Sequence, residues 1–209
     1  MATTIQDGTG EGWSLKIDSE GRLYNQAVSD TAIEYAAQEG RAFNLNTLFL
    51  PISSSGENAL LYVKNNEDED LIVAAWFIGT DNAAGTPSRQ GLAAVYVNPT
   101  GGTLIASASV VTPVNRRLGS AETLDALIYK GGDGYTITGQ LTDPVLYQTQ
   151  GSSARAFGEV YITIPKGSSL AVTYTPNGAE PLEVYTGFQV YNKMHKNEKA
   201  KRFKIWDLK

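Results

Sequence analysis

The sequence contains no cysteine and only one histidine among its 209 residues. Without cysteine, the chain can form no disulfide framework, no thiolate metal site and no cysteine nucleophile. A single histidine also excludes most histidine-ligated zinc sites. A chain of this length buries about 70% of the surface that it exposes when unfolded, so it needs no such support.

Charged residues and long apolar runs are also scarce. Charged residues make up 19% of the chain, whereas it has 21 glycines and 11 tyrosines. This composition is typical of a β-protein and not of a charged helical bundle. No stretch approaches the roughly 18 apolar residues of a membrane-spanning helix, so we expect no membrane partner. Residues 1–7 lack the basic and apolar regions of a secretory signal, which predicts synthesis in a cytoplasm.

The charges are unevenly divided along the chain. Residues 1–192 carry 10 basic and 20 acidic groups, a net charge of −10, whereas residues 193–209 carry 7 basic and 2 acidic groups, a net charge of +5. A basic tail on an acidic body predicts a contact made by the tail. The partner could be nucleic acid or an acidic protein surface, and the alternative is a solvated chain end.

Short apolar runs separated by turn residues dominate from residue 41 onward. The turns lie at residues 65–70, 98–102, 131–134 and 165–168, and each is flanked by two runs that suggest a hairpin. The eight or nine runs predict an all-β, antiparallel β-sandwich over residues 40–192. Residues 1–39 form an N-terminal arm in this interpretation, and residues 193–209 form a C-terminal one. Ser29 or Asp30 could cap a short helix that ends at Gly40.

The alternation of side chains along the strands separates an inner from an outer face. The run Leu71–Ile78 is apolar on both faces, which predicts a central strand or a strand covered by a partner. In the late strands the outward positions carry Tyr161, Tyr185 and Tyr191 beside polar groups. Outward tyrosines suit a protein interface or a sugar-binding surface, and the simpler alternative is a half-covered sheet face.

Catalytic and metal-binding patterns are weak. His195, the only histidine, stands among lysines, which is a poor setting for a catalytic triad. The carboxylates of residues 65–70 could hold Ca²⁺, but their spacing is not that of an EF-hand and a charged turn is the simpler interpretation. Glu159 and Glu183 lie on the outer phase of late strands and could form a pair that hydrolyses a glycoside, but two unrelated surface groups are the simpler interpretation. The glycines at residues 8–12 lack the strand and helix that flank a phosphate-binding loop.

Four segments carry a resemblance to a known group of proteins. They are Glu39–Thr47, Asn58–Asp68, Val97–Thr103 and Ile164–Leu170. Their order resembles that of tailed-bacteriophage virion structural proteins, over roughly residues 39–190. The resemblance implies a jelly-roll module that decorates capsids or builds collars, fibres or tail parts. It places no catalytic residue and no cofactor on this chain.

The resemblance therefore implies a non-enzymatic component of a phage virion, with capsid decoration (a cement protein) placed ahead of a collar or tail position. The expected partners are further copies of the chain, with a homotrimer favoured, and the major capsid protein or other virion proteins. Nucleic acid is not a favoured partner. Two other functions stay open: a jelly roll that binds host-surface glycan through tyrosines and carboxylates, and a small β-sandwich hydrolase.

The C-terminal tail combines its charge with large apolar residues near its end. Phe203, Ile205, Trp206 and Leu208 would not be needed by a purely nucleic-acid-binding tail, and a solvated end would not usually expose them. The sequence therefore predicts that the tail docks on a neighbouring subunit with Trp206 as its anchor. Together with the three outward tyrosines, these residues are the expected interface.

Overall fold

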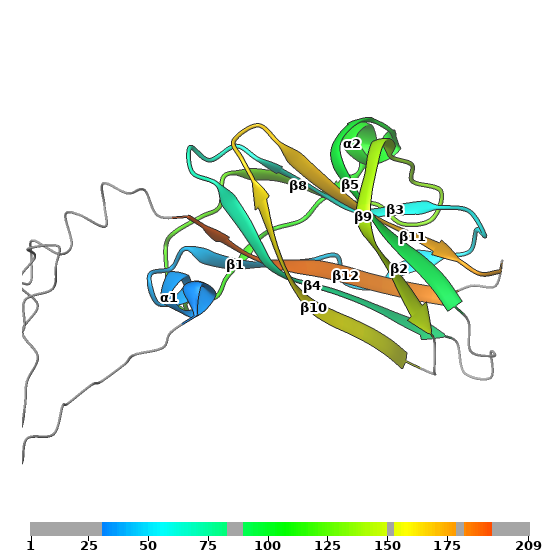
Figure 1. Ribbon diagram of the computed structural model, residues 1–209, viewed down its shortest axis with the longest axis horizontal. Coiled ribbons are helices and arrows are strands. Elements are labelled where there is room, and N and C mark those ends of the chain that lie inside the picture. Colours follow the sequence, from blue (N-terminus) through cyan, green and yellow to red (C-terminus); the bar gives the residue numbers. More distant parts are fainter. Residues whose placement is uncertain (1–30, 83–89, 150–152, 179–181, 194–209) are drawn as a thin grey trace, which may run out of the picture. The chain divides into compact units, whose positions relative to one another are not determined.

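Strands far apart in the sequence pair with one another, so the chain forms a long folded hairpin (Figure 1). The structure is a computed structural model that describes residues 31–82, 90–149, 153–178 and 182–193. The antiparallel pairs are β1 (Ala42–Asn46) with β12 (Leu182–Asn192), β3 (Asn58–Asn65) with β11 (Ser169–Pro176), β4 (Leu71–Asn82) with β10 (Ser153–Ile164), and β5 (Gln90–Gly101) with β9 (Thr138–Thr149). The early strands thus pair with the late ones in reverse order.

The long hairpin is rolled into two sheets that pack face to face. The shorter strands are β2 (Leu50–Ile52), β6 (Ser109–Val110), β7 (Val114–Asn115) and β8 (Ala126–Lys130). The β12 sheet has the order β10-β4-β12-β1-β7, and β2 also pairs with β12. The β11 sheet has the order β6-β8-β3-β11-β5-β9. Four strand pairs rolled into two packed sheets make a jelly roll, which confirms the predicted all-β sandwich.

The core lies between the inner faces of the two sheets. Trp76 of β4 and Phe188 of β12 meet there, with ring centroids 6.5 Å apart. The indole Nε1 of Trp76 donates a hydrogen bond of 2.9 Å to Thr186 Oγ1, so this polar group is satisfied inside the core. The predicted alternation of β12 is confirmed. Its buried side chains include Leu182, Val184, Phe188 and Val190, and its outward ones are Glu183, Tyr185, Gln189 and Tyr191.

The segment between β5 and β9 extends both sheets on one edge. It holds α2 (Thr103–Ser107), β6, β7 and β8. β8 pairs with β3 in one sheet, and β7 pairs with β1 in the other. α2 packs on the outer face of the β11 sheet, where the Leu104 side chain is fully buried. A single insertion therefore covers an edge of each sheet and part of one outer face.

The short helix expected before the sandwich is also present. α1 (Ala32–Gln38) ends ahead of Gly40, whose φ of 77° lies in the left-handed region that glycine adopts without strain. α1 packs against β1 and β12. The capping positions Ser29 and Asp30 lie outside the described residues. No helix in the part of the chain that the structure describes has the length and apolar character of a transmembrane helix.

The four predicted hairpins are wrong, although turns or bends occur in or beside these connections. The connections at 65–70 and 165–168 cross from one sheet to the other instead of joining paired strands. The connection at 98–102 leads from β5 into α2, where a strand was expected. The connection at 131–134 joins β8 to β9, which pair with β3 and β5. In a rolled hairpin most consecutive strands alternate between sheets, so a turn signal does not identify the pairing partner.

The apolar run Leu71–Ile78 belongs to a central strand. It lies within β4, which pairs with β10 on one side and β12 on the other. Its side chains are buried within the chain, except that of Phe77, which is half-buried. Of the two explanations offered by the sequence, the central strand is the one that the structure confirms.

Candidate functional site

The outer face of the β12 sheet carries two aromatic rings, each opposite a glycine. Tyr185 pairs with Gly79 across β12 and β4, and Phe77 pairs with Gly187. A Cβ at Gly79 would lie 2.1 Å from Tyr185 Cζ, and one at Gly187 would lie 2.4 Å from Phe77 Cζ. The rings therefore lie over the glycine backbone, with centroids 6.4 Å apart. Only glycine leaves room for rings in this position.

A rigid turn beside these rings exposes two more apolar side chains. The turn between β1 and β2 leaves Leu48 64% and Phe49 54% exposed. Thr47 anchors it, since its Oγ1 accepts a 3.0 Å hydrogen bond from Thr186 N. The Leu48 N–H donates to Asn46 Oδ1 at 2.8 Å.

Leu48 adopts a φ of 57°, which costs a branched residue about 1 kcal/mol. Phe49 meets the Tyr185 ring edge-on, with centroids 5.2 Å apart and planes at 71°. The apolar residues are thus held in a fixed position outside the core. We call Leu48, Phe49, Phe77 and Tyr185 the apolar centre of this face.

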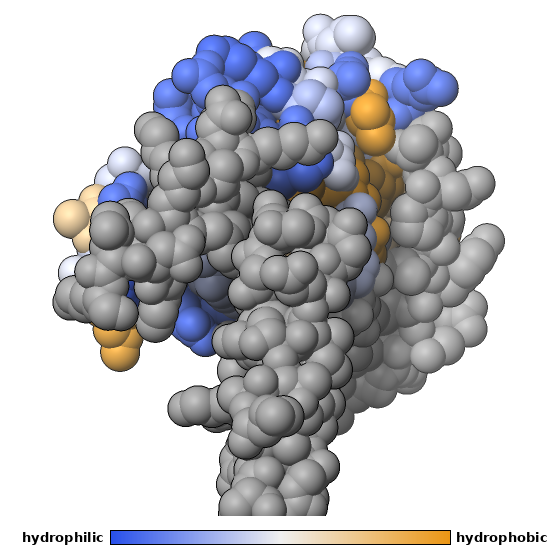
Figure 2. Space-filling view, turned by 60° about the vertical axis from the view of Figure 1, so that its left-hand side comes forward, coloured by the Kyte–Doolittle hydropathy of each residue, from blue (hydrophilic) through white to orange (hydrophobic). Residues whose placement is uncertain are grey.

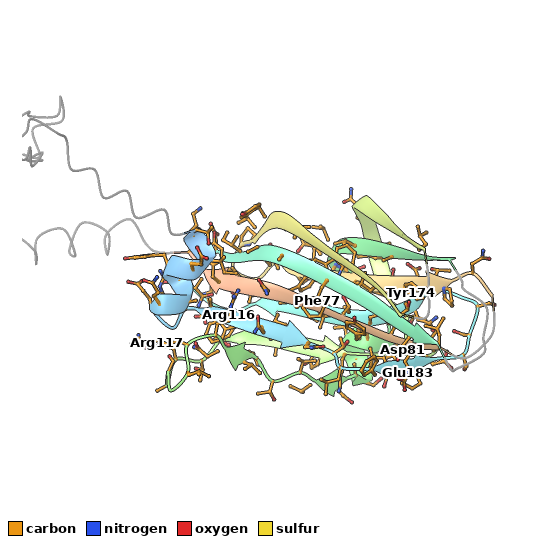
Figure 3. All side chains as sticks on the ribbon, turned by 90° about the horizontal axis from the view of Figure 1, so that it is seen from below. Phe77, Asp81, Arg116, Arg117, Tyr174 and Glu183 are labelled. Carbon is orange, nitrogen blue, oxygen red and sulfur yellow. The ribbon has the colours of Figure 1, made fainter. Side chains whose placement is uncertain are left out.

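Charged residues lie on both sides of the apolar centre. At one end Asp81 and Glu183 stand directly opposite each other on β4 and β12. At the other end Arg116 and Arg117 follow β7, and Arg116 Nη1 donates a 3.0 Å hydrogen bond to Gln189 Oε1. Figure 3 shows the two arginines toward one end of the sandwich, Phe77 between, and the two carboxylates toward the other end. This outer face therefore has an acidic end and a basic end.

The outer face of the β11 sheet is organised differently, because the chain covers part of it. Tyr62 of β3 and Tyr129 of β8 stack with centroids 6.0 Å apart and planes at 12°. Leu104 of α2 packs with them over the small residues Ala59 and Ala171. Tyr62 is buried as a result. This is a second, smaller core outside the sandwich.

Glu57 holds a third tyrosine on the same face. Tyr96 Oη donates to the Glu57 carboxylate at 3.0 Å, and Thr173 Oγ1 donates to Glu57 Oε1 at 2.7 Å. Burial raises the pKa of Tyr96 above its usual value, and the hydrogen bond and negative charge of Glu57 raise it further. Tyr96 is therefore held neutral and in one position.

An open pocket of about 490 Å³ lies beside the tyrosine stack, between β3, β5 and the β10–β11 connection. Tyr62, Lys64, Asn98 and Lys166 contribute to its lining. Asn98 Oδ1 accepts a 2.8 Å hydrogen bond from Ser169 N, which fixes one wall. The pocket presents ammonium, amide and hydroxyl groups beside an aromatic ring. Such groups suit a polar ligand that carries hydroxyls or negative charge.

The acidic turn Asn65–Asp70 lies next to this pocket, and its carboxylates are engaged separately. Asp68 pairs with Lys166, and Asp70 Oδ2 lies 3.2 Å from Lys193 Nζ. Glu67 Oε1 accepts a 2.8 Å hydrogen bond from Asp125 N. The connections that hold this turn and Lys166 lie at the top of Figure 1, where the described surface is strongly hydrophilic (Figure 2). No group of three ligating side chains that could hold a metal ion occurs among the described residues, so the Ca²⁺ alternative gains no support.

The three tyrosines expected at an interface occupy separate places. Tyr161 is 59% exposed and lies in a β-bulge of the edge strand β10, with a φ of 44°. Tyr185 and Tyr191 are half-buried on β12, six residues and therefore about 20 Å apart. They form no single cluster. The other expected interface residues, Phe203, Ile205, Trp206 and Leu208, lie outside the described residues, as do His195 and the glycines at 8–12.

The two carboxylates considered for glycoside hydrolysis are far apart along the sheet. In the strand register Glu183 lies opposite Asp81, and Glu159 lies opposite Ala75. The two positions are six residues apart along β4, which is about 20 Å. Glycosidase carboxyl groups are about 5–9.5 Å apart, so these backbone positions do not suit that chemistry.

Sequence reasoning did not find the apolar centre or the two charged ends. The run Thr47–Leu50 contained a signal, because three consecutive apolar residues there break the alternation of a strand. The charged ends gave no signal in the sequence, because Arg116 and Glu183 come to the same sheet face only through pairing of strands that are far apart in the sequence. Compared with protein-family models and with curated proteins, the chain matches none.

Proposed function

We propose that the protein is a structural, non-enzymatic component of a tailed-bacteriophage virion, and more specifically a capsid decoration protein. The observation that carries the proposal is the jelly-roll strand order, which is common in viral capsid proteins. The inference from fold to function is an analogy, because jelly rolls also occur in lectins and cupins. The four segments that resemble virion proteins give it its direction.

The surface supports a role in assembly. A rigid turn exposes Leu48 and Phe49 next to the Phe77 and Tyr185 rings. Clustered exposed apolar groups of this kind typically mark contacts with other proteins. A decoration protein stabilises a shell by burying such a surface against neighbouring subunits, since binding to the assembled state alone adds to its stability.

Purified phage particles test this proposal. We expect mass spectrometry to find the chain in particles purified by density gradient, and cryo-electron microscopy to place it at a fixed position on the capsid. Particles made without it should lose DNA at a lower temperature, and adding the protein back should restore the original temperature. A chain found only in the lysate of infected cells, and never in purified particles, would contradict the virion role.

The pocket on the β11 sheet supports a second proposal, that the protein binds host-surface glycan. A sugar could lie in the pocket against Tyr62 while Lys64 and Asn98 bind its hydroxyl or acidic groups. A glycan array tests this, with Lys64→Ala as the variant and Arg117→Ala on the other sheet as the control. Glycan binding that Lys64→Ala removes and Arg117→Ala does not would place the protein in a host-recognition part of the particle.

A further inference from the structure

Four charged side chains on the outer face of the β12 sheet make no ion pair with any residue that the structure describes. Asp81 and Glu183 at one end, and Arg116 and Arg117 at the other, pair with no opposite charge in the part of the chain that the structure describes. Asp81 and Glu183 also stand directly opposite each other, an arrangement in which like charges repel. Within the described residues the acidic end has no opposite charge beside it, and a partner could supply one.

The positions of these charges are related by the register of the strands. Glu183 and Asp81 share one row across the sheet, and Gly187 and Phe77 share the middle row. Arg116 N donates to the Ala42 carbonyl, and Ala42 lies opposite Tyr191, so Arg116 lies at the row of Tyr191. The acidic and basic rows are about 26 Å apart along β12. The acidic and basic ends thus lie on opposite sides of the middle row.

We infer that this face binds a second copy of the chain, related by a two-fold axis that crosses the strands at the row of Gly187 and Phe77. Such an axis reverses the strand direction of the second copy. Asp81 and Glu183 of each copy then face Arg116 and Arg117 of the other, and the contact forms twice. The inference does not depend on a virion role, because the partner is the chain itself.

Electrostatics selects this axis over the other two-fold axis that the face allows. An axis parallel to the strands would place the acidic end of one copy against the acidic end of the other, and like charges that meet at an interface are unfavourable.

The apolar residues also meet apolar residues under this axis. Leu48 and Phe49 lie beside β12 on one side of the middle row. Val114, which is 61% exposed, pairs with Asn44 on the other side of that row. The axis places the turn of one copy over the Val114 region of the second copy. The apolar centre is then removed from water on both copies.

The area of the face suits a weak but specific dimer. Rows 183 to 191 of four strands measure about 27 Å by 19 Å, or about 500 Å² per copy. Because α1 packs against β1 and β12, this is an upper value. Two copies would bury at most about 1,000 Å², the lower limit for a specific interface. We therefore expect a dissociation constant in the micromolar range.

Charge reversal tests the arrangement. One variant carries Asp81→Lys and Glu183→Lys, and the other carries Arg116→Glu and Arg117→Glu. In sedimentation velocity the unchanged chain should form a dimer, and each variant alone should raise the dissociation constant at least tenfold. An equimolar mixture of the two variants should dimerise again, because every contact in the mixed pair joins opposite charges. Lys64→Glu on the other sheet is the control and should have no effect.

Other outcomes would overturn the inference. A chain that stays monomeric at high concentration, a trimer, or a dimer indifferent to both reversals would each exclude the proposed pairing. Circular dichroism must show that the variants keep the strand content of the unchanged chain. If a reversal variant fails to fold, Leu48→Lys replaces it, since this exposed side chain supports no core, and it too should weaken the dimer at least tenfold.

Discussion

The two outer faces of the sandwich differ in what covers them. On the β11 sheet, α2 and stacked tyrosines bury a second core, and Glu57 fixes Tyr96. On the β12 sheet, Tyr185 and Phe77 lie over glycines and stay half-buried, while Leu48 and Phe49 are exposed. Among the described residues, α2 thus covers part of one face, whereas the other is met by α1 only where α1 packs against β1 and β12, and its apolar centre stays exposed.

The comparison shows how one insertion can give two faces different roles. The segment between β5 and β9 supplies Leu104, which covers the β11 sheet, and also Arg116, which charges one end of the β12 sheet. Covering an apolar sheet face lowers the free energy of the folded chain, because it removes apolar area from water. An open face keeps that area available for a partner. The following substitutions test this distinction, starting with the largest expected effect.

Gly187→Ala should have the largest effect, because the new Cβ would lie 2.1 Å from the Leu45 carbonyl oxygen as well as near the Phe77 ring. The backbone cannot move away without breaking the pairing of β1 with β12. We expect a loss of about 3 kcal/mol in the free energy of unfolding, measured by urea denaturation. Gly79→Ala is the matched control on the same face. The three atoms nearest its Cβ belong to the outer end of the Tyr185 ring, which can turn outward, so it should cost about 1 kcal/mol. Equal losses would show that the open face is not held as described.

Leu104→Ala removes the main contact between α2 and the β11 sheet. The side chain is fully buried, but the short helix can settle toward the sheet, so we expect a loss of about 2 kcal/mol. The variant should also expose the stacked tyrosines to solvent, which near-ultraviolet circular dichroism detects. Val110→Ala, at an exposed position on β6, should leave both measurements unchanged. An unchanged unfolding curve for Leu104→Ala would mean that α2 does not cover this face.

Glu57→Gln removes a charge from the covered face but keeps a hydrogen-bond acceptor. The pKa of Tyr96 should fall toward 10.0 without reaching it, because burial, its largest cause, persists. Since the folded pKa is raised, the stability that it provides is present below pH 10.0 and is lost as the pH rises through the folded value. The variant should therefore lose less stability in alkali, by about 1 kcal/mol. Nuclear magnetic resonance titration of labelled tyrosine measures the pKa, with Glu183→Gln on the open face as the control.

Asp133→Asn affects the connection through which the chain passes from the β12 sheet to the β11 sheet. The Asp133 carboxylate accepts hydrogen bonds from Ser53 N at 3.1 Å and Ser54 N at 2.9 Å, and also binds the Ser53 hydroxyl. The Ser53 hydroxyl is the largest cause that lowers the pKa of Asp133 from 3.8 to about 2.

The resulting stability is present above pH 3.8 and is lost as the pH falls through about 2. Because the group is exposed, we expect only about 0.5 kcal/mol. Urea unfolding at several acidic pH values should show a shallower dependence in the variant. A profile that keeps its slope would mean that another group titrates there.

Local patterns predicted the fold class and the inward side of the strands. The alternation along Leu182–Tyr191 was sufficient to assign inner and outer faces, because it depends only on the period of two in a strand. The helix before Gly40 was also predicted correctly from the residues expected to begin and end it. Both signals act within a few residues, so neither needs knowledge of the rest of the chain.

Pairing and surface composition could not be predicted in the same way. The sequence near residue 131 contains a turn, but nothing in it reveals that β8 pairs with β3 and not with β9. The open face joins residues such as Phe49, Arg116 and Tyr185, which meet only when β1, β7 and β12 assemble. Tyr161, Tyr185 and Tyr191 were expected at an interface, and their positions on β10 and β12 could not be derived from the sequence.

The reverse-order pairing of the strands also fixes when each contact can form. β6 and β8 are the nearest paired strands in sequence among the described residues, whereas β1 must wait for β12, which lies more than 140 residues further along the chain. Such high contact order predicts folding in milliseconds to seconds. During translation, which adds about 5–20 residues per second, β1, β3 and β4 emerge many seconds before their partners. The growing chain therefore carries unpaired strand edges for longer than it needs to fold once it is complete.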